Sequence, residues 1–125
     1  MAGTVLLVED DPLIASFVVK ALGKWGYDAE WVVKGQDALA RVAEGGVDLQ
    51  LLDLGLPDID GLEVLRTLRE RGSGVPVIVV TSRTDPKDKA TALALGVDDY
   101  LMKPFALTAL LEAVRASLSS RVAPE

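Results

Sequence analysis

Five polar side chains stand at the ends of short apolar runs in this sequence, and their types are those needed to move a phosphoryl group. They are Glu9, Asp10, Asp53, Thr81 and Lys103. If the runs are neighbouring parallel strands, their carboxyl ends meet at one edge of the sheet, where ligands of such sheets bind. Three carboxylates, a hydroxyl and an ammonium group would then share one shallow pocket.

The charges of that pocket indicate a divalent cation. Three carboxylates and one lysine leave a net charge of about −2, and like charges a few ångström apart raise one another's pKa. The 125-residue chain contains no His and no Cys, so only oxygen atoms can act as ligands. Oxygen ligands favour Mg²⁺ or Mn²⁺ over zinc.

With such a cation, Asp53 can act as a nucleophile toward a phosphoryl group. The cation and Lys103 would offset charge on the phosphoryl oxygens, and Thr81 would donate a hydrogen bond to one of them. The sequence therefore indicates phosphoryl transfer onto an aspartate.

The elements that must position these residues alternate along the chain. Short apolar or β-branched runs predict strands over residues 5–8, 29–33, 49–52, 77–81 and 100–102. Apolar residues at helical spacing predict helices over residues 14–25, 38–42, 61–68 and 107–118, with a weaker Ala-rich pattern over 86–96. The alternation predicts an α/β fold, a (βα)₅ doubly wound five-stranded parallel sheet in the flavodoxin-like order 2-1-3-4-5.

Four segments resemble the receiver domain of bacterial two-component response regulators, over residues 4 to about 119. They are VEDD at 8–11, LDLGLPDIDGL at 52–62, TS at 81–82 and GVDDYLMKPF at 96–105. The resemblance implies that Asp53 is the phosphoacceptor. It also implies that Mg²⁺ is bound by Glu9, Asp10, Asp53 and the backbone carbonyl of Gly55.

The same resemblance implies roles for other residues. Thr81 would be the switch hydroxyl, Lys103 the phosphate-pairing lysine, and Tyr100 an aromatic that turns inward when Thr81 moves. Gly55 and Arg83 would flank the water path to the acyl phosphate and tune its lifetime. In this family the peptide corresponding to Lys103-Pro104 is usually cis, an isomer that Pro permits at low cost.

The partners follow partly from composition. Because the chain has no His, the histidine from which the family takes its phosphoryl group must belong to a sensor histidine kinase. We expect self-catalysed phosphorylation and later hydrolysis, not the activity of a conventional enzyme. A net charge of −6 argues against nucleic-acid binding by this segment. With no signal peptide and no apolar run long enough to span a membrane, we expect a soluble, cytoplasmic protein.

The output surface implied by the resemblance is the fourth helix, fifth strand and fifth helix. Relatives with winged-helix domains dimerise there through salt bridges, but the helix-five positions of one charged pair hold Ala109 and Ala113. Three alternatives stay open for this surface: it forms a homodimer, it docks an apolar partner, or Ala109 and Ala113 are part of a neutral surface. We expect a receiver domain over residues 1–119. Residues 120–125 would be a tail or the start of a linker to a DNA-binding domain that regulates transcription.

Other interpretations of the same residues remain. A degenerate receiver would serve as a protein-binding module independent of phosphorylation. A phosphatase of the haloacid-dehalogenase type would need an acid at position 55, which is Gly55, and an EF-hand loop from Asp58 would need Glu at position 69, which is Arg69. Asp11, followed by Pro, is interpreted as a helix N-cap and not as a ligand. Trp25 and Trp31 are interpreted as packing residues.

Overall fold

The computed structural model describes residues 3–119, which form a five-stranded parallel sheet in the order β2-β1-β3-β4-β5. The strands are β1 (Thr4–Val8), β2 (Asp28–Val32), β3 (Leu49–Leu52), β4 (Val77–Thr81) and β5 (Asp99–Met102). The helices are α1 (Pro12–Lys24), α2 (Gly35–Ala43), α3 (Gly61–Glu70), α4 (Pro86–Ala94) and α5 (Leu107–Ser119). The predicted fold and strand order are confirmed, with β2 one residue earlier than expected.

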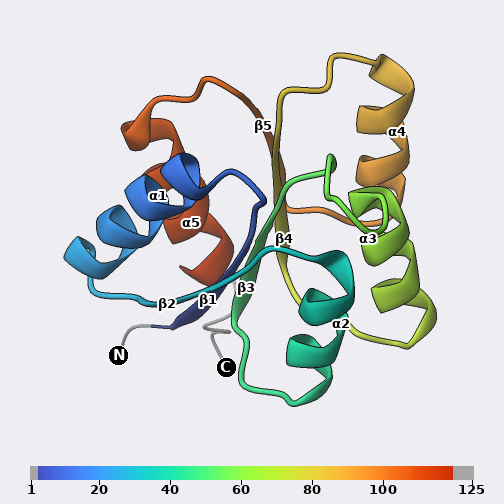
Figure 1. Ribbon diagram of the computed structural model, residues 1–125, viewed down its shortest axis with the longest axis horizontal. Coiled ribbons are helices and arrows are strands. Elements are labelled where there is room, and N and C mark those ends of the chain that lie inside the picture. Colours follow the sequence, from blue (N-terminus) through green and yellow to red (C-terminus); the bar gives the residue numbers. More distant parts are fainter. Residues whose placement is uncertain (1–2, 120–125) are drawn as a thin grey trace.

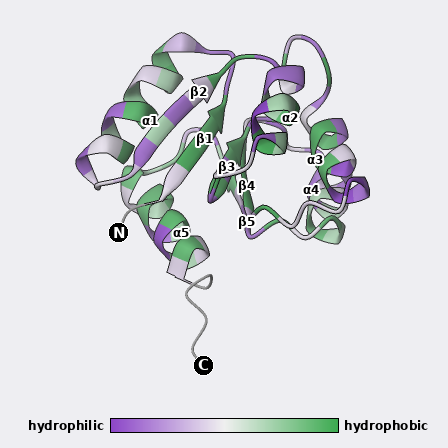
Figure 2. Ribbon diagram, turned by 90° about the horizontal axis from the view of Figure 1, so that it is seen from below, coloured by the Kyte–Doolittle hydropathy of each residue, from purple (hydrophilic) through white to green (hydrophobic). Residues whose placement is uncertain are grey.

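Helices cover both faces of the sheet (Figure 1). Helices α1 and α5 pack on one face around Leu7, Leu51 and Ile78, whereas α2, α3 and α4 pack on the other around Leu6 and Leu52. Neighbouring residues of each central strand thus enter opposite cores, which explains why those strands read as continuous apolar runs. Figure 2 shows this hydrophobic interior between helices with polar outer faces.

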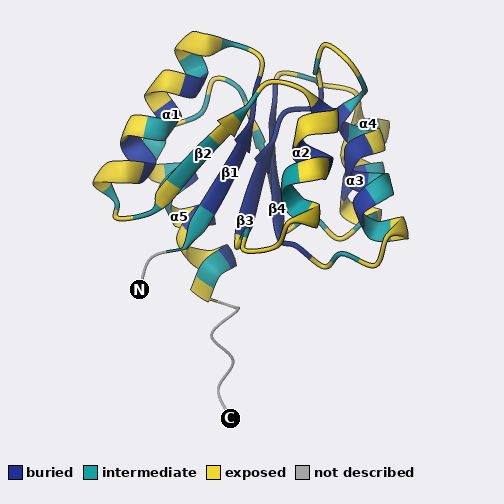
Figure 3. Cartoon of the chain, turned by 60° about the horizontal axis from the view of Figure 1, so that its bottom comes forward, coloured by how far each residue is buried: buried dark blue, intermediate teal, exposed yellow. Residues whose placement is uncertain are grey.

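Burial follows the position of each strand in the sheet. Strands β3 and β4 are buried along their whole length, whereas β2, at an edge, is partly exposed (Figure 3). Gln50 is the polar exception in β3: its side chain is fully buried, and both amide atoms lack a hydrogen-bond partner among the described residues. An unpartnered buried amide costs free energy.

Aspartate side chains cap the N-termini of four helices. Three of these aspartates are the N-cap residue of their own helix, and the fourth lies in a distant segment of the chain. Asp11, Asp60 and Asp85 are the N-caps of α1, α3 and α4, which confirms the cap interpretation of Asp11. Asp58, two residues before the N-cap of α3, accepts hydrogen bonds from the backbone N–H groups of Gly35 and Gln36 at 2.8 and 2.9 Å. It therefore caps α2, whose own N-cap residue offers no side-chain acceptor.

None of the helices formed by residues 3–119 is both long enough and apolar enough to cross a membrane. The tail expected at residues 120–125 lies outside the described residues.

Candidate functional site

The predicted acids meet at the carboxyl ends of β1 and β3. Val8 and Leu52 are register partners in adjacent strands, so the residues that follow them, Glu9 and Asp53, lie side by side. Both are buried, whereas Asp10 is exposed. One carboxylate oxygen from each of the three residues lies within 4.8 Å of the others.

Lys103 joins this acid cluster from the end of β5. Its Nζ donates to Glu9 Oε1 at 2.8 Å and to Asp53 Oδ2 at 3.1 Å. The lysine side chain is only 14% exposed, so water screens these ion pairs less than it would at the surface. The peptide that joins Lys103 to Pro104 is cis, as the resemblance implies.

The pKa values of Glu9 and Lys103 are both raised, but for opposite reasons. Burial is the largest influence on Glu9 and raises its pKa, although hydrogen bonds from Lys103 and from the Asp11 backbone N–H oppose it. Burial alone would lower the pKa of Lys103, but its hydrogen bonds and attraction to Glu9 and Asp53 together outweigh burial and raise that pKa. The lysine therefore stays cationic, while ionisation of Glu9 remains costly without further positive charge.

The three carboxylates fit a hard divalent cation. Their oxygens converge within one coordination shell, and they include no nitrogen or sulfur ligand. The exposed side of the cluster is formed by Asp10, which leaves an approach for water and for a phosphorylated molecule. Glu9, Asp10 and Asp53 are thus the residues that could hold Mg²⁺.

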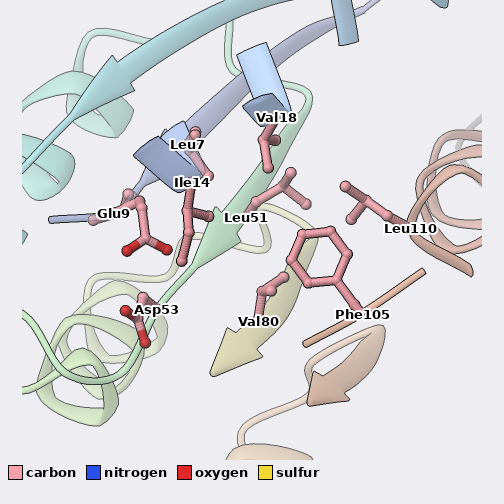
Figure 4. Close-up of a pocket in the computed structure, with 10 residues that line it drawn as sticks. Leu7, Glu9, Ile14, Val18, Leu51, Asp53, Val80, Phe105 and Leu110 are labelled. Atoms are coloured by element: carbon pink, nitrogen blue, oxygen red, sulfur yellow. The ribbon is translucent and has the colours of Figure 1, made fainter. Parts of the chain in front are cut away.

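A small apolar cavity of about 10 Å³ lies behind Glu9 and Asp53, roughly the space of a single water molecule. Figure 4 shows the two carboxylates next to each other at one end of this cavity, with Val80 and Phe105 along another side. The apolar wall explains why Glu9 is strongly desolvated although its carboxylate faces the cluster.

Thr81 and Arg83 lie on the β4 side of the site. Thr81 is buried, and its Oγ1 accepts a hydrogen bond from the Arg83 backbone N–H at 3.3 Å. The Arg83 guanidinium donates to the Leu54 carbonyl at 3.2 Å and to Asp60, and it lies 3.6 Å from Asp88. Arg83 therefore links the segment after β3 to α4 at the rim of the acid cluster.

The two glycines near Asp53 have different surroundings. A Cβ atom on Gly61 would lie 2.5 Å from the Asp53 carbonyl oxygen and 2.5 Å from the Leu54 Cα atom. Gly61 thus lets the start of α3 approach the backbone after β3 more closely than any other residue would allow. Gly55 is exposed with open space around it, and its N–H donates to Asp53 Oδ1 at 3.3 Å.

Tyr100 lies in β5 on the α4 side of the sheet. Its ring is buried, its hydroxyl lacks a hydrogen-bond partner among residues 3–119, and Lys89 Nζ lies 5.8 Å from the ring centroid. Of the two alanines in α5, Ala113 is buried in the core and Ala109 is half-buried. The interpretation of Ala113 as neutral surface is therefore wrong, because this turn of α5 packs onto the sheet.

Trp31 contacts the site although no role was predicted for it. Its Nε1 donates to the backbone carbonyl of Glu9 at 2.7 Å. No local pattern could have revealed this contact, because it depends on how β2 is placed beside the end of β1 in the folded chain.

The chain matches the family model described as "Response regulator receiver domain" over residues 5–115. It is 42% identical over 114 residues to "Transcriptional regulatory protein TrcR" of Mycobacterium tuberculosis, covering 91% of this chain and 44% of that protein. It is 42% identical over 118 residues to "DNA-binding response regulator MtrA" of Mycolicibacterium smegmatis, covering 94% and 51%. The chain thus spans about half the length of these curated relatives.

Solved structures show the same architecture. A CheY-like receiver domain protein from Methanospirillum hungatei superposes with a TM-score of 0.91 at 29% identity, covering 97% of each chain. The BeF3-activated N-terminal receiver domain of RstA from Klebsiella pneumoniae superposes with a TM-score of 0.85 at 32% identity, covering 93% of this chain and 98% of that one.

Proposed function

The chain belongs to the response regulator receiver family, and from that premise we propose that it is a Mg²⁺-dependent switch phosphorylated on Asp53 by a partner histidine kinase. The observation that carries the proposal is Lys103 Nζ, which lies 2.8 Å from Glu9 and 3.1 Å from Asp53 at the end of the sheet. A buried lysine bound to two carboxylates, beside a third, is a costly arrangement for stability alone.

In the proposed reaction, a carboxylate oxygen of Asp53 attacks the phosphorus of a phosphohistidine. The phosphorus–nitrogen bond breaks, its electron pair stays on the imidazole nitrogen, and that nitrogen takes a proton from water. Lys103 pairs with a phosphoryl oxygen, and Thr81 donates a hydrogen bond to another. Mg²⁺ held by Glu9, Asp10, Asp53 and the Gly55 carbonyl would supply positive charge against the phosphoryl oxygens. Hydrolysis of the acyl phosphate later resets the site.

Two residues are proposed to set the lifetime of the phosphorylated state. Gly55 leaves one side of Asp53 open, since a Cβ atom at this position would have no neighbour within 4 Å. Arg83 bounds the other side through its bonds to Leu54 and Asp60. A water molecule attacking the acyl phosphate would pass between these positions.

Phosphorylation is proposed to shift an equilibrium between two conformers. Thr81 would turn toward the phosphoryl group, Tyr100 would occupy the space behind it, and the surface of α4, β5 and α5 would change. That surface would control a homodimer and a C-terminal DNA-binding output domain that regulates transcription. The names of TrcR, a transcriptional regulatory protein, and MtrA, a DNA-binding response regulator, support the output domain. We place this activity in the cytoplasm.

The proposal is tested by incubating the protein with acetyl phosphate and Mg²⁺ and weighing it intact. We expect an increase equal to one phosphoryl group, lost when EDTA is added and lost in Asp53→Asn. The matched control is Asp37→Asn, which changes an exposed aspartate of α2 and should be phosphorylated as wild type. Absence of an Asp53-dependent adduct would favour a binding module that ignores phosphorylation.

The switch is tested separately with Thr81→Ala. This variant should still be phosphorylated, because Asp53 and Lys103 are intact, but phosphorylation should no longer change the surface of α4, β5 and α5. Amide hydrogen exchange of these elements, with and without acetyl phosphate, measures that coupling. A wild-type response of the exchange rates in Thr81→Ala would contradict the role assigned to the hydroxyl.

A further inference from the structure

Both backbone groups of Glu9 are held by the end of β2. Its N–H donates to the Val32 carbonyl at 3.1 Å, and its carbonyl accepts from the Trp31 indole Nε1 at 2.7 Å. The first bond continues the sheet ladder, which any sequence could supply. The second depends on the side chain at this one position, where the indole of Trp31 supplies the donor on a large, rigid ring.

The Trp31 bond fixes the peptide that leads into Asp10. The carbonyl of Glu9 and the nitrogen of Asp10 belong to one planar unit, so an anchored carbonyl sets the direction in which the Asp10 backbone starts. The position of Asp10 depends on its backbone, because its side chain is exposed and its carboxylate makes no hydrogen bond among the described residues. Glu9, by contrast, is fixed by Lys103 and by the Asp11 N–H.

Packing alone does not account for Trp31. Its register partner in β1 is Leu7, so the indole lies on the α1 face of the sheet, yet it is 42% exposed on an edge strand. A phenylalanine would cover the same apolar surface without a polar atom. What only the indole adds here is the donor aimed at Glu9.

We propose that Trp31 is a positioning residue for the cation site: its N–H holds the Glu9–Asp10 peptide so that Asp10 can bind a divalent cation together with Glu9 and Asp53. This inference rests on the proposed function, since it assumes that the three acids bind a cation. It adds a residue outside the acid cluster, on β2, to the parts that the cation site requires.

The test is a titration with Mn²⁺ alone, in which the electron paramagnetic resonance signal reports the free ion. We expect Trp31→Phe, which keeps an aromatic ring and removes the N–H, to bind Mn²⁺ about tenfold more weakly than wild type, as is usual when a residue behind a metal ligand is lost. Trp25→Phe is the matched control, because Trp25 follows α1 at its far end; it should bind as wild type.

A second readout uses the emission of the tryptophans. With excitation that is selective for tryptophan, Trp25→Phe reports on Trp31, and saturating Mg²⁺ should change its emission because the cation alters the field around the Glu9 carbonyl. Trp31→Phe reports on Trp25 in the same way, and Mg²⁺ should leave its emission unchanged. Circular dichroism of Trp31→Phe should match that of wild type, since the ring is partly exposed and the fold does not depend on it.

The outcomes separate the two proposals. If wild type binds Mn²⁺ but Trp31→Phe binds it equally well, the inference about Trp31 is wrong and the proposed switch stands. If wild type binds no Mn²⁺, while it also fails to form the Asp53 adduct, the proposed function is wrong and the positioning role falls with it. A tenfold loss confined to Trp31→Phe supports both.

Discussion

The Nζ atom of Lys103 lies 3.1 Å from Oδ2 of Asp53, so the cation that would later pair with a phosphoryl group already pairs with the proposed phosphoacceptor. The two residues are 50 positions apart in the chain and meet because β3 and β5 both flank β4. In this arrangement the lysine neutralises part of the negative charge of the acid cluster, a task that a bound divalent cation would share.

The first prediction concerns this lysine. Lys103→Met should lower the free energy of unfolding in metal-free buffer by about 3 kcal/mol, because it leaves buried carboxylates without their cation. Mg²⁺ should restore more stability to this variant than it adds to wild type, since binding to the folded state alone stabilises it. Urea unfolding with EDTA and with MgCl₂ measures both effects. An equal loss under the two conditions would show that Lys103 does not neutralise the acid cluster.

The second prediction compares two glycines. Gly61→Ala should cost about 1–3 kcal/mol, because the added methyl group overlaps the backbone of Asp53 and Leu54 and forces it to move. The same displacement should slow phosphorylation by acetyl phosphate. Gly55→Ala, where a Cβ meets nothing within 4 Å, should stay within about 1 kcal/mol of wild type. Thermal unfolding of the two variants measures this difference in stability. Equal stabilities would mean that the backbone near Gly61 can move to accommodate a methyl group at little cost.

The third prediction concerns pH and Asp58. Backbone N–H groups of Gln36, Gly35 and Ile59 outweigh burial and hold the pKa of the Asp58 carboxyl below its usual range. A lowered pKa in the folded state adds stability that is complete above the unfolded pKa and is lost as the pH falls through the folded value. Asp58→Ala should therefore melt at a lower temperature than wild type at neutral pH, and the difference should shrink in acid.

The control for Asp58 is Asp37→Ala. Asp37 is an exposed acid in the first turn of the same helix, α2, and it makes no side-chain hydrogen bond among the described residues. Its loss should lower the melting temperature less. A melting difference for Asp58→Ala that stays constant down to pH 2–3, on the order of one unit below the usual Asp pKa, would argue against the titration.

The fourth prediction concerns the buried amide in β3. Gln50→Met keeps the length of the side chain but removes both unpartnered polar atoms, and it should raise the free energy of unfolding by about 1–3 kcal/mol. Gln50→Ala also removes the amide but leaves a cavity, so it should be less stable than Gln50→Met. Urea unfolding of both variants measures the difference. A loss of stability in Gln50→Met would indicate that the amide has a partner, such as a buried water molecule.

Much of the fold followed from local patterns. Runs such as 77–81 and capped starts such as Asp11-Pro12 predicted the strands and helices because each reflects the environment of a few neighbouring residues. The strand order was expected because it is one of the common orders of doubly wound sheets. Once that order is assumed, the residues after Val8 and Leu52 must lie together, since parallel neighbours end at the same edge. The convergence of Glu9, Asp10, Asp53 and Lys103 could be predicted for that reason.

Contacts that depend on the orientation of side chains from distant segments could not be predicted in this way. Asp58 caps α2 rather than the helix that follows it, Arg83 reaches Asp60, and Trp31 donates to Glu9. In each case the residue type permits many partners, and the choice among them is made by the geometry of packed elements. The sequence alone therefore determined which chemistry the site offers, whereas the tertiary structure decided which neighbours hold it in place, because hydrogen bonds require distances and directions that only the assembled sheet and helices set.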